Sequence, residues 1–293
     1  MIKVGIIVNR EKDKNLKYTK ILIESLKKRG ADIKACSDIL RETNIKAEGL
    51  DEEGVFDNSD IIICLGGDGS FLGVARKVYK RNIPILGINL GALGFLTEVE
   101  KKDIDKAVEC IIGGKYSIEE RMMLETEILR EDRILGKDIA LNDVVISRGA
   151  LSRILHVSTY INGTFVDSFP GDGLIVSTPT GSTGYTLSTG GPIVEPDVDI
   201  IIVSPICPHI LYSRSFITTG DRTVKAVIQE NYSHSAMVTV DGQKGYEVRG
   251  GDVVTVKKSE YKVKLVRINT RNFFNILRSK IYYRGEKVLK NEI

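Results

Sequence analysis

The stretch "DIIICLGGDGSFLGVARKVYKR", residues 60–81, decides the fold of the first part of the chain. Its apolar start predicts a strand buried on both faces, and "SFLGVARKVYKR" after the glycine-rich turn predicts a helix. The same order recurs on both sides: "IKVGIIV" and "NLKYTKILIESLKKRG" precede it, while "IPILGINL" and "DIDKAVECII" follow. Repeated strand–helix order predicts an α/β domain with a parallel sheet over residues 1–120.

The pattern changes near residue 120. From "MMLETEILR" to "KVKLVRI" strand patterns dominate, and Asn162-Gly163 between two of them is a strong hairpin signal. We therefore expect residues 121–269 to form a mostly antiparallel, β-sandwich-like domain. The last segment, "NFFNILRSKIYY", has a helical pattern, and we expect residues 270–293 to pack back on the first domain.

Composition narrows the class of protein. The net charge is only +3 over 293 residues, and no run of five like charges is present, which argues against nucleic-acid and membrane-surface partners. Four scattered cysteines lack metal-ligand or redox spacing, and no apolar run approaches the ~20 residues of a membrane-spanning helix. The N-terminal apolar run is too short for a signal peptide. We expect a soluble cytoplasmic protein that binds small molecules.

Asp68 is unusual because it places a negative charge among the glycines of "GGDG", residues 66–69. The turn lacks the lysine of a P-loop and the spacing of a dinucleotide-binding fingerprint. One interpretation is a tight turn capped by an acidic side chain. The other is catalytic: turn amides and the helix N-terminus hold a phosphate, while Asp68 accepts a proton from the attacking hydroxyl. A divalent metal would offset the remaining repulsion.

Two further stretches are candidate sites. "STPTGSTGYTLSTGGP", residues 177–192, combines hydroxyls and glycines that suit a neutral polar ligand, although a surface loop is the alternative. In "ALNDVVISR", Asn142 and Asp143 interrupt an apolar strand. They mark either a bulge or strand end, or a pair that holds the two adjacent hydroxyls of a ribose.

Together these motifs resemble the NAD kinase family. The resemblance covers nearly the whole chain, through "GGDG", "GINLGALGFL", "LNDVV", "DGLIVSTPTGSTGYTLSTGGPIV", "SPICPHILYSR" and "VDGQ". "GGDG" alone would be weak, because phosphofructokinases and diacylglycerol kinases carry similar turns. The long threonine- and glycine-rich block is the specific part.

The resemblance implies transfer of the terminal phosphate of ATP, with a divalent metal cation such as Mg²⁺, to the adenosine-side 2′-hydroxyl of NAD. It implies that Asp68 is the proton acceptor. The residues that it implies for substrate and nucleotide binding are Gly69, Asn142, Asp143, Arg153, Asp172, Thr183, Gly184, Tyr185, Thr186, Leu187, Ser188 and Gln243. It also implies a homodimer or homotetramer in which Asp172 serves the pocket of a neighbouring subunit.

The chain departs from the family pattern at two places. Many relatives have Asn-Glu where this chain has Asn142-Asp143, and Pro170 replaces a basic residue that often precedes the aspartate by two positions. Two other functions remain open at this point. A lipid kinase of the diacylglycerol type shares the glycine-rich turn, and a non-catalytic NAD(P)-binding sensor would share the binding residues. An intact Asp68 argues against the sensor.

Overall fold

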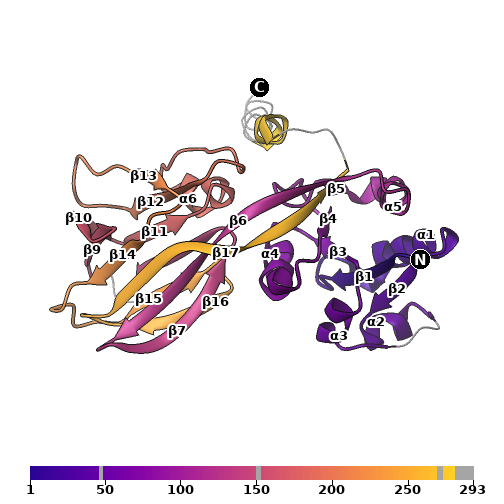
Figure 1. Ribbon diagram of the computed structural model, residues 1–293, viewed down its shortest axis with the longest axis horizontal. Helices are drawn as coiled ribbons and strands as arrows, with labels where there is room; N and C mark the ends of the chain where they lie inside the picture. Colours follow the sequence, from indigo (N-terminus) through magenta and orange to yellow (C-terminus); the bar gives the residue numbers. More distant parts are fainter. Residues whose placement is uncertain (46–48, 150–152, 269–272, 281–293) are drawn as a thin grey trace, which may run out of the picture. The chain divides into compact units, whose positions relative to one another are not determined.

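A computed structural model describes residues 1–45, 49–149, 153–268 and 273–280 of the chain (Figure 1). The chain divides into two compact units, the first made of residues up to 120 and from 263 onward, the second of residues 121–262. The chain passes from one unit to the other inside two long strands, β6 (Ser117–Arg130) and β17 (Val253–Arg267). No helix within the described ranges is both long enough and apolar enough to span a membrane.

The first unit is an α/β domain built on a parallel sheet in the order β17-β4-β3-β1-β2, with β5 beside β4. All six residues of β3 are buried, as the continuous apolar run predicts. The C-terminal end of β17 joins the sheet parallel to β4, where Leu265 pairs with Ile85. The strands are β1 (Lys3–Val8), β2 (Asp32–Ala35), β3 (Ile61–Gly66), β4 (Ile85–Asn89) and β5 (Val99–Glu100).

Five α-helices lie among the described residues 17–112, and each of them buries apolar side chains. Leu22, Ile23 and Leu26 are buried on one face of α1, which ends before Gly30 in the left-handed region at φ 73°. The helices are α1 (Lys17–Lys28), α2 (Ser37–Glu42), α3 (Glu52–Asp57), α4 (Asp68–Val78) and α5 (Ile104–Ile112). Short 3₁₀ turns are η1 (Lys14–Leu16), η2 (Tyr79–Arg81) and η3 (Lys101–Asp103).

The terminal segment is described only in part. Residues 273–280 form a helix, in agreement with the helical pattern of "NFFNILRSKIYY". The rings of Phe273 and Phe95 lie 6.0 Å apart, so this helix contacts the loop after β4 within the first unit. We expected residues 270–293 to pack on the first domain. Of these, residues 270–272 and 281–293 lie outside the described residues.

The second unit contains two antiparallel layers. One is a six-stranded sheet in the order β13-β12-β11-β8-β15-β16, and the other follows the path β10-β9-β14-β17, with β6 and β7 beside β17. Side chains of both layers share one apolar core, which includes Val144, Val176 and Val203 from one layer and Val157 and Val254 from the other. Face-to-face burial of this kind is a β-sandwich arrangement, so the expected fold class is confirmed.

The remaining strands of this unit are short, apart from β7 and β10. They are β7 (Arg133–Ala140), β8 (Asp143–Arg148), β9 (Leu155–Ile161), β10 (Thr164–Gly171), β11 (Gly173–Ser177), β12 (Ile200–Ile206), β13 (Phe216–Thr219), β14 (Val224–Ile228), β15 (Ala236–Val240) and β16 (Lys244–Val248). The predicted hairpin joins β9 and β10, and Asn162 and Gly163 have φ of 48° and 80°, as a type I′ turn requires.

Candidate active site

The glycine-rich turn lies at the carboxyl edge of the parallel sheet. β3 ends at Gly66, α4 begins at Asp68, and Gly66 pairs in register with Asn89 at the end of β4. The loops after two neighbouring strands therefore meet at one edge, which is where open α/β sheets bind ligands. Gly69 faces open space, because a Cβ built there would meet no heavy atom within 4 Å.

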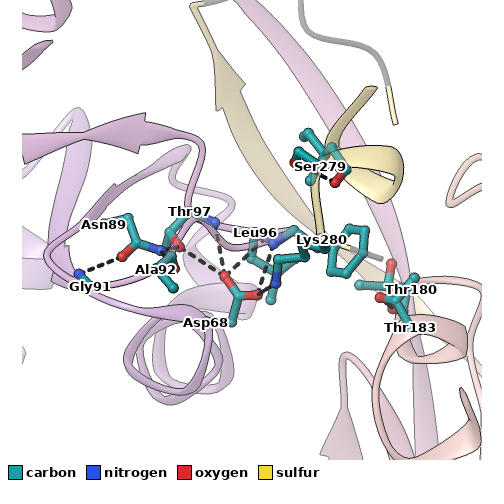
Figure 2. Close-up of polar contacts among 12 residues, drawn as sticks. Asp68, Asn89, Gly91, Ala92, Leu96, Thr97, Thr180, Thr183, Ser279 and Lys280 are labelled. Atoms are coloured by element: carbon teal, nitrogen blue, oxygen red, sulfur yellow. Dashed lines mark hydrogen bonds and ion pairs between the residues drawn. The ribbon is translucent and has the colours of Figure 1, made fainter. Parts of the chain in front are cut away.

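Asp68 ties these two loops together. Its Oδ2 accepts a hydrogen bond from the backbone N–H of Phe95 at 2.8 Å (Figure 2). Its Oδ1 accepts from the N–H groups of Leu96 and Thr97 at 3.2 and 3.1 Å, and from the Thr97 hydroxyl at 2.9 Å. Gly67 is the N-cap of α4, and these hydrogen bonds of the Asp68 side chain all go to the loop after β4. Asp68 is thus held across the sheet edge rather than used as the cap of its own helix.

Asn89 and Gly94 support this arrangement. The Asn89 amide donates to the Ala92 carbonyl at 2.7 Å and to the Thr97 hydroxyl at 2.8 Å, and its Oδ1 accepts from Gly91 N–H at 2.7 Å (Figure 2). Gly94 lies so close that a Cβ there would overlap Oδ1 of Asp68. A side chain at position 94 would therefore displace the carboxylate.

Two lysines lie close to the turn. Lys280, at the end of helix 273–280, places its Nζ 3.9 Å from Oδ2 of Asp68 and 4.4 Å from the ring centre of Phe95 (Figure 2). The Nζ of Lys12 would lie 2.7 Å from a Cβ built on Gly67. Sequence reasoning missed both, because no local pattern brings the β1–α1 loop or the terminal helix to the turn. Their positive charges favour an anion at this edge.

In the second unit, Asn142 and Asp143 lie at the start of β8, which is the strand-end interpretation of the polar pair. The carboxylate of Asp241 accepts hydrogen bonds from three consecutive backbone N–H groups, those of Leu141 at 2.8 Å, Asn142 at 2.7 Å and Asp143 at 3.1 Å. The N–H of Asp241 returns a bond to the Asp143 carbonyl at 2.9 Å. Asp241, in the "VDGQ" motif, therefore fixes this backbone from one side.

The other side of the segment is fixed by hydroxyls of "STPTGSTGY". The Ser177 hydroxyl donates to the Asn142 carbonyl at 3.1 Å, and the Thr178 hydroxyl donates to the Leu141 carbonyl at 2.6 Å. The backbone N–H of Thr178 also donates to the Asn142 carbonyl at 2.9 Å. Backbone amides and carbonyls of the segment are thus both used internally, which leaves the side chains of Asn142 and Asp143 for other partners.

The side chains of Asn142 and Asp143 converge near Gly184. A Cβ on Gly184 would lie 3.6 Å from Nδ2 of Asn142 and 3.8 Å from Oδ2 of Asp143. Within the described part of the chain, the buried Oδ1 of Asn142 finds no hydrogen-bond donor. Burial, together with the nearby charge of Asp241, raises the pKa of Asp143 to about 7. A buried acceptor without a protein donor is available to water or to a ligand.

The threonine- and glycine-rich block folds into the 3₁₀ turn η4 (Thr180–Thr183) and the short helix α6 (Tyr185–Ser188). Thr186 is buried, and its hydroxyl finds no partner among the described residues. Tyr185, Leu187 and Ser188 are exposed. Burial of part of the Tyr185 ring, and then the charges of Cys207 and Asp172, raise the pKa of its hydroxyl. The block therefore presents an aromatic ring and hydroxyls beside Asp143.

Three further expected binding residues lie on other segments of the second unit. Asp172, between β10 and β11, is bound by Arg148, whose Nε donates to Oδ1 at 2.6 Å. Arg153 is exposed just before β9, and Gln243 is exposed in the turn after β15. Within the described residues, neither Arg153 nor Gln243 forms a hydrogen bond or ion pair with Asn142, so their roles stay predictions.

Comparison with known proteins agrees with these features. Residues 4–116 match the ATP-NAD kinase N-terminal domain, and residues 141–268 match the ATP-NAD kinase C-terminal domain. The chain is 58% identical over 288 residues to the NAD kinase of Acetivibrio thermocellus, covering 98% of this chain and all of that one. It is 50% identical over 289 residues to the NAD kinase of Ruminiclostridium cellulolyticum, with the same coverage.

Solved structures show the same fold. Yeast NADH kinase complexed with NADH superposes with a TM-score of 0.87 at 22% identity, over 97% of this chain and 88% of that one. An NAD kinase from Archaeoglobus fulgidus in complex with ATP gives a TM-score of 0.76 at 24% identity, over 95% and 99%. Both matched domains and the curated relatives span almost the full length, so the chain belongs to the NAD kinase family of phosphotransferases.

Proposed function

We propose that this protein phosphorylates NAD with ATP, by transfer of the terminal phosphate to the adenosine-side 2′-hydroxyl to give NADP. The activity is supported by 58% and 50% sequence identity to two curated NAD kinases over almost the whole chain. The observation in the structure that supports it most is Asp68, which lies at the carboxyl edge of the sheet beside open space at Gly69, with two lysines close to the turn. Phosphoryl transfer needs this combination of a positioned acid and local positive charge.

Asp68 acts as the proton acceptor. Oδ1 is engaged by Leu96 and Thr97, whereas Oδ2 accepts a single backbone bond, from Phe95. Oδ2 therefore keeps lone-pair capacity for the hydroxyl that attacks the phosphate. The bonds from the loop after β4 hold the carboxylate in place before substrate arrives, and such positioning is a large part of catalysis in phosphoryl transfer.

Asn142 and Asp143 hold the ribose hydroxyls of NAD. The amide donates and accepts, while the carboxylate only accepts, so the pair matches two adjacent hydroxyls. Thr183 to Ser188 line the adenosine side, with Tyr185 as the aromatic member. The partner-free hydroxyl of Thr186 and the exposed ring of Tyr185 support this assignment.

The residues of this site fit a divalent metal ion such as Mg²⁺ that binds together with the nucleotide phosphates. The described residues gather no group of three His, Cys, Asp or Glu side chains that could hold a metal ion. Mg²⁺ in kinases is commonly held by one or two carboxylates together with substrate phosphates and water. Asp68 is the carboxylate that would hold it, through water, and the metal would neutralise phosphate charge.

A coupled assay for NADP formation tests this function. We expect NADP to accumulate when ATP, NAD and Mg²⁺ are present. Without ATP, no NADP should form. The same assay over ATP or polyphosphate as donor, and NAD or NADH as acceptor, defines the substrates. Binding of NAD without any NADP formation would favour the sensor function, and phosphorylation of diacylglycerol instead of NAD would favour the lipid kinase.

A further inference from the structure

Asp241 lies in a turn that does not require an acid. The N–H of Gln243 donates to the Val240 carbonyl at 2.9 Å, and Asp241 and Gly242 have φ of 52° and 62°, which defines a type I′ turn. Asn, Asp and Gly all suit the first central position of this turn. The carboxylate of Asp241 is instead used by Leu141, Asn142 and Asp143, about a hundred residues earlier in the chain.

This arrangement places two buried carboxylates close together, and they differ in the hydrogen bonds that stabilise their charges. Asp241 is 6% exposed and receives three amide bonds, whereas the Asp143 carboxylate, also 6% exposed, receives no hydrogen bond from the described residues. Burial first, and then repulsion by Asp241, raise the pKa of Asp143 to about 7. The residue that fixes the backbone of Asp143 thus also acts on its charge.

We propose that Asp241 is a positioning residue, which aims Asn142 and Asp143 at the acceptor ribose and, through Asp143, makes NAD binding depend on pH near neutrality. The proposal rests on the function proposed above. Ionised Asp143 accepts bonds from ribose hydroxyls, and protonation removes acceptor capacity. NAD affinity should therefore fall as the pH is lowered through about 7.

Among the described residues, two cations of the second unit have partners other than Asp143. Arg121 of β6 donates to the Thr180 hydroxyl in η4 at 3.3 Å, and Lys244 of β16 lies 3.8 Å from Asp138. The pKa of the Tyr185 hydroxyl in α6 is raised above its ordinary value of about 10, chiefly by burial, so Tyr185 stays neutral near pH 7. Asp241 is thus the charge that acts directly on Asp143.

The variant Asp241→Asn removes the negative charge at position 241 and keeps the conformation of the turn. Asn tolerates the left-handed φ of this turn, so the hairpin is retained. One acceptor oxygen is lost and the repulsion of Asp143 disappears, which lowers the pKa of Asp143 while burial stays. Asp143→Asn removes the titrating group. Asp252→Asn is the matched control, because Asp252 is another buried acid of the second unit that binds Arg130 and the N–H of Arg249.

The experiment measures the Kd of NAD by calorimetry between pH 5.5 and 8.5, and kcat at saturating NAD, for the full chain and these variants. A single carboxyl with a pKa near 7 weakens NAD binding about tenfold from pH 8 to pH 6 in the unaltered protein. Asp241→Asn should bind NAD several-fold more weakly at pH 8, with the pH midpoint moved down and kcat changed less than Kd. In Asp143→Asn the Kd of NAD should not change between pH 6 and pH 8. In Asp252→Asn it should change as in the unaltered protein.

Three results would overturn the proposal: equal NAD affinity at pH 6 and pH 8 in the unaltered protein, an unchanged midpoint in Asp241→Asn, or a moved midpoint in Asp252→Asn. A protein that neither binds NAD nor forms NADP would instead contradict the proposed function. In that case, carbon NMR titration of the Asp143 carboxyl still decides the coupling. Its midpoint must fall in Asp241→Asn, and an equal midpoint in both proteins refutes the role of Asp241.

Discussion

Asp68 binds the loop after β4, and we propose that it also accepts the proton of the attacking hydroxyl. The isosteric variant Asp68→Asn tests these two roles separately. In Asp68→Asn, the side-chain oxygen can still accept from Leu96 and Thr97, so three of the four bonds that hold the loop after β4 should remain. The bond from the Phe95 N–H is lost, because the amide nitrogen cannot accept it. We expect the melting temperature and the Kd of NAD to change little while kcat falls about 10²–10⁴-fold, because the amide cannot accept the proton. Asp105→Asn, which breaks an exposed pair with Arg29, is the control. A loss of kcat below about tenfold would contradict the assignment.

Asn142 tests the ribose contact. Truncation in Asn142→Ala leaves its backbone bonds to Asp241, Ser177 and Thr178 intact, so the segment should keep its shape. The lost hydrogen bond is worth about 1–3 kcal/mol, or roughly 5- to 150-fold in the Kd of NAD. ATP binding, measured by the same titration, should stay nearly unchanged. An equal weakening for both nucleotides would place Asn142 outside the acceptor site.

At the scale of elements, the loop between β4 and β5 offers a matched pair of glycine substitutions. A Cβ on Gly94 overlaps the carboxylate of Asp68, whereas a Cβ on Gly91 makes only ordinary contact with Asn89, at 3.7 Å. Gly94→Ala should therefore displace Asp68 and lower kcat at least tenfold, which is the size of effect that misplacement of a catalytic group produces. Gly91→Ala should retain most activity in the same assay. Similar activities in the two variants would mean that the position of Asp68 is not critical.

Elements with strong local signals could be predicted from the sequence, and contacts across long separations could not. The apolar run of β3 and the Asn162-Gly163 turn follow from residues that are neighbours in the chain. The bond from Asp241 to Asn142 spans 99 positions, and the approach of Lys280 to Asp68 spans more than two hundred. No periodicity encodes such pairs, because tertiary packing alone brings them together.

At the scale of the whole molecule, the resemblance to the NAD kinase family predicts a homo-oligomer whose active sites combine residues of two subunits. Asp68 and Asp172 belong to different units of the chain, and Asp172 is paired with Arg148 of its own chain. Asp68→Asn and Asp172→Ala should each be nearly inactive alone. Co-expressed with different tags and purified as mixed oligomers, they should regain part of the activity, because a symmetric interface restores some sites with both residues. Mixed oligomers as inactive as either parent would mean that Asp172 acts within its own chain or in folding.

The return of β17 to the parallel sheet sets an order for folding on the ribosome. The second unit is continuous in sequence and is complete at residue 262, whereas the first unit still lacks the strand that pairs with β4. That strand contributes Val266 to the core and Arg267, which pairs with Glu98 and Glu119. Until it emerges, the edge of β4 at Ile85, which β5 does not cover, stays open to other nascent chains, a recognised route to aggregation. Premature termination just before residue 263 should therefore yield insoluble protein, even though nine-tenths of the chain has been made.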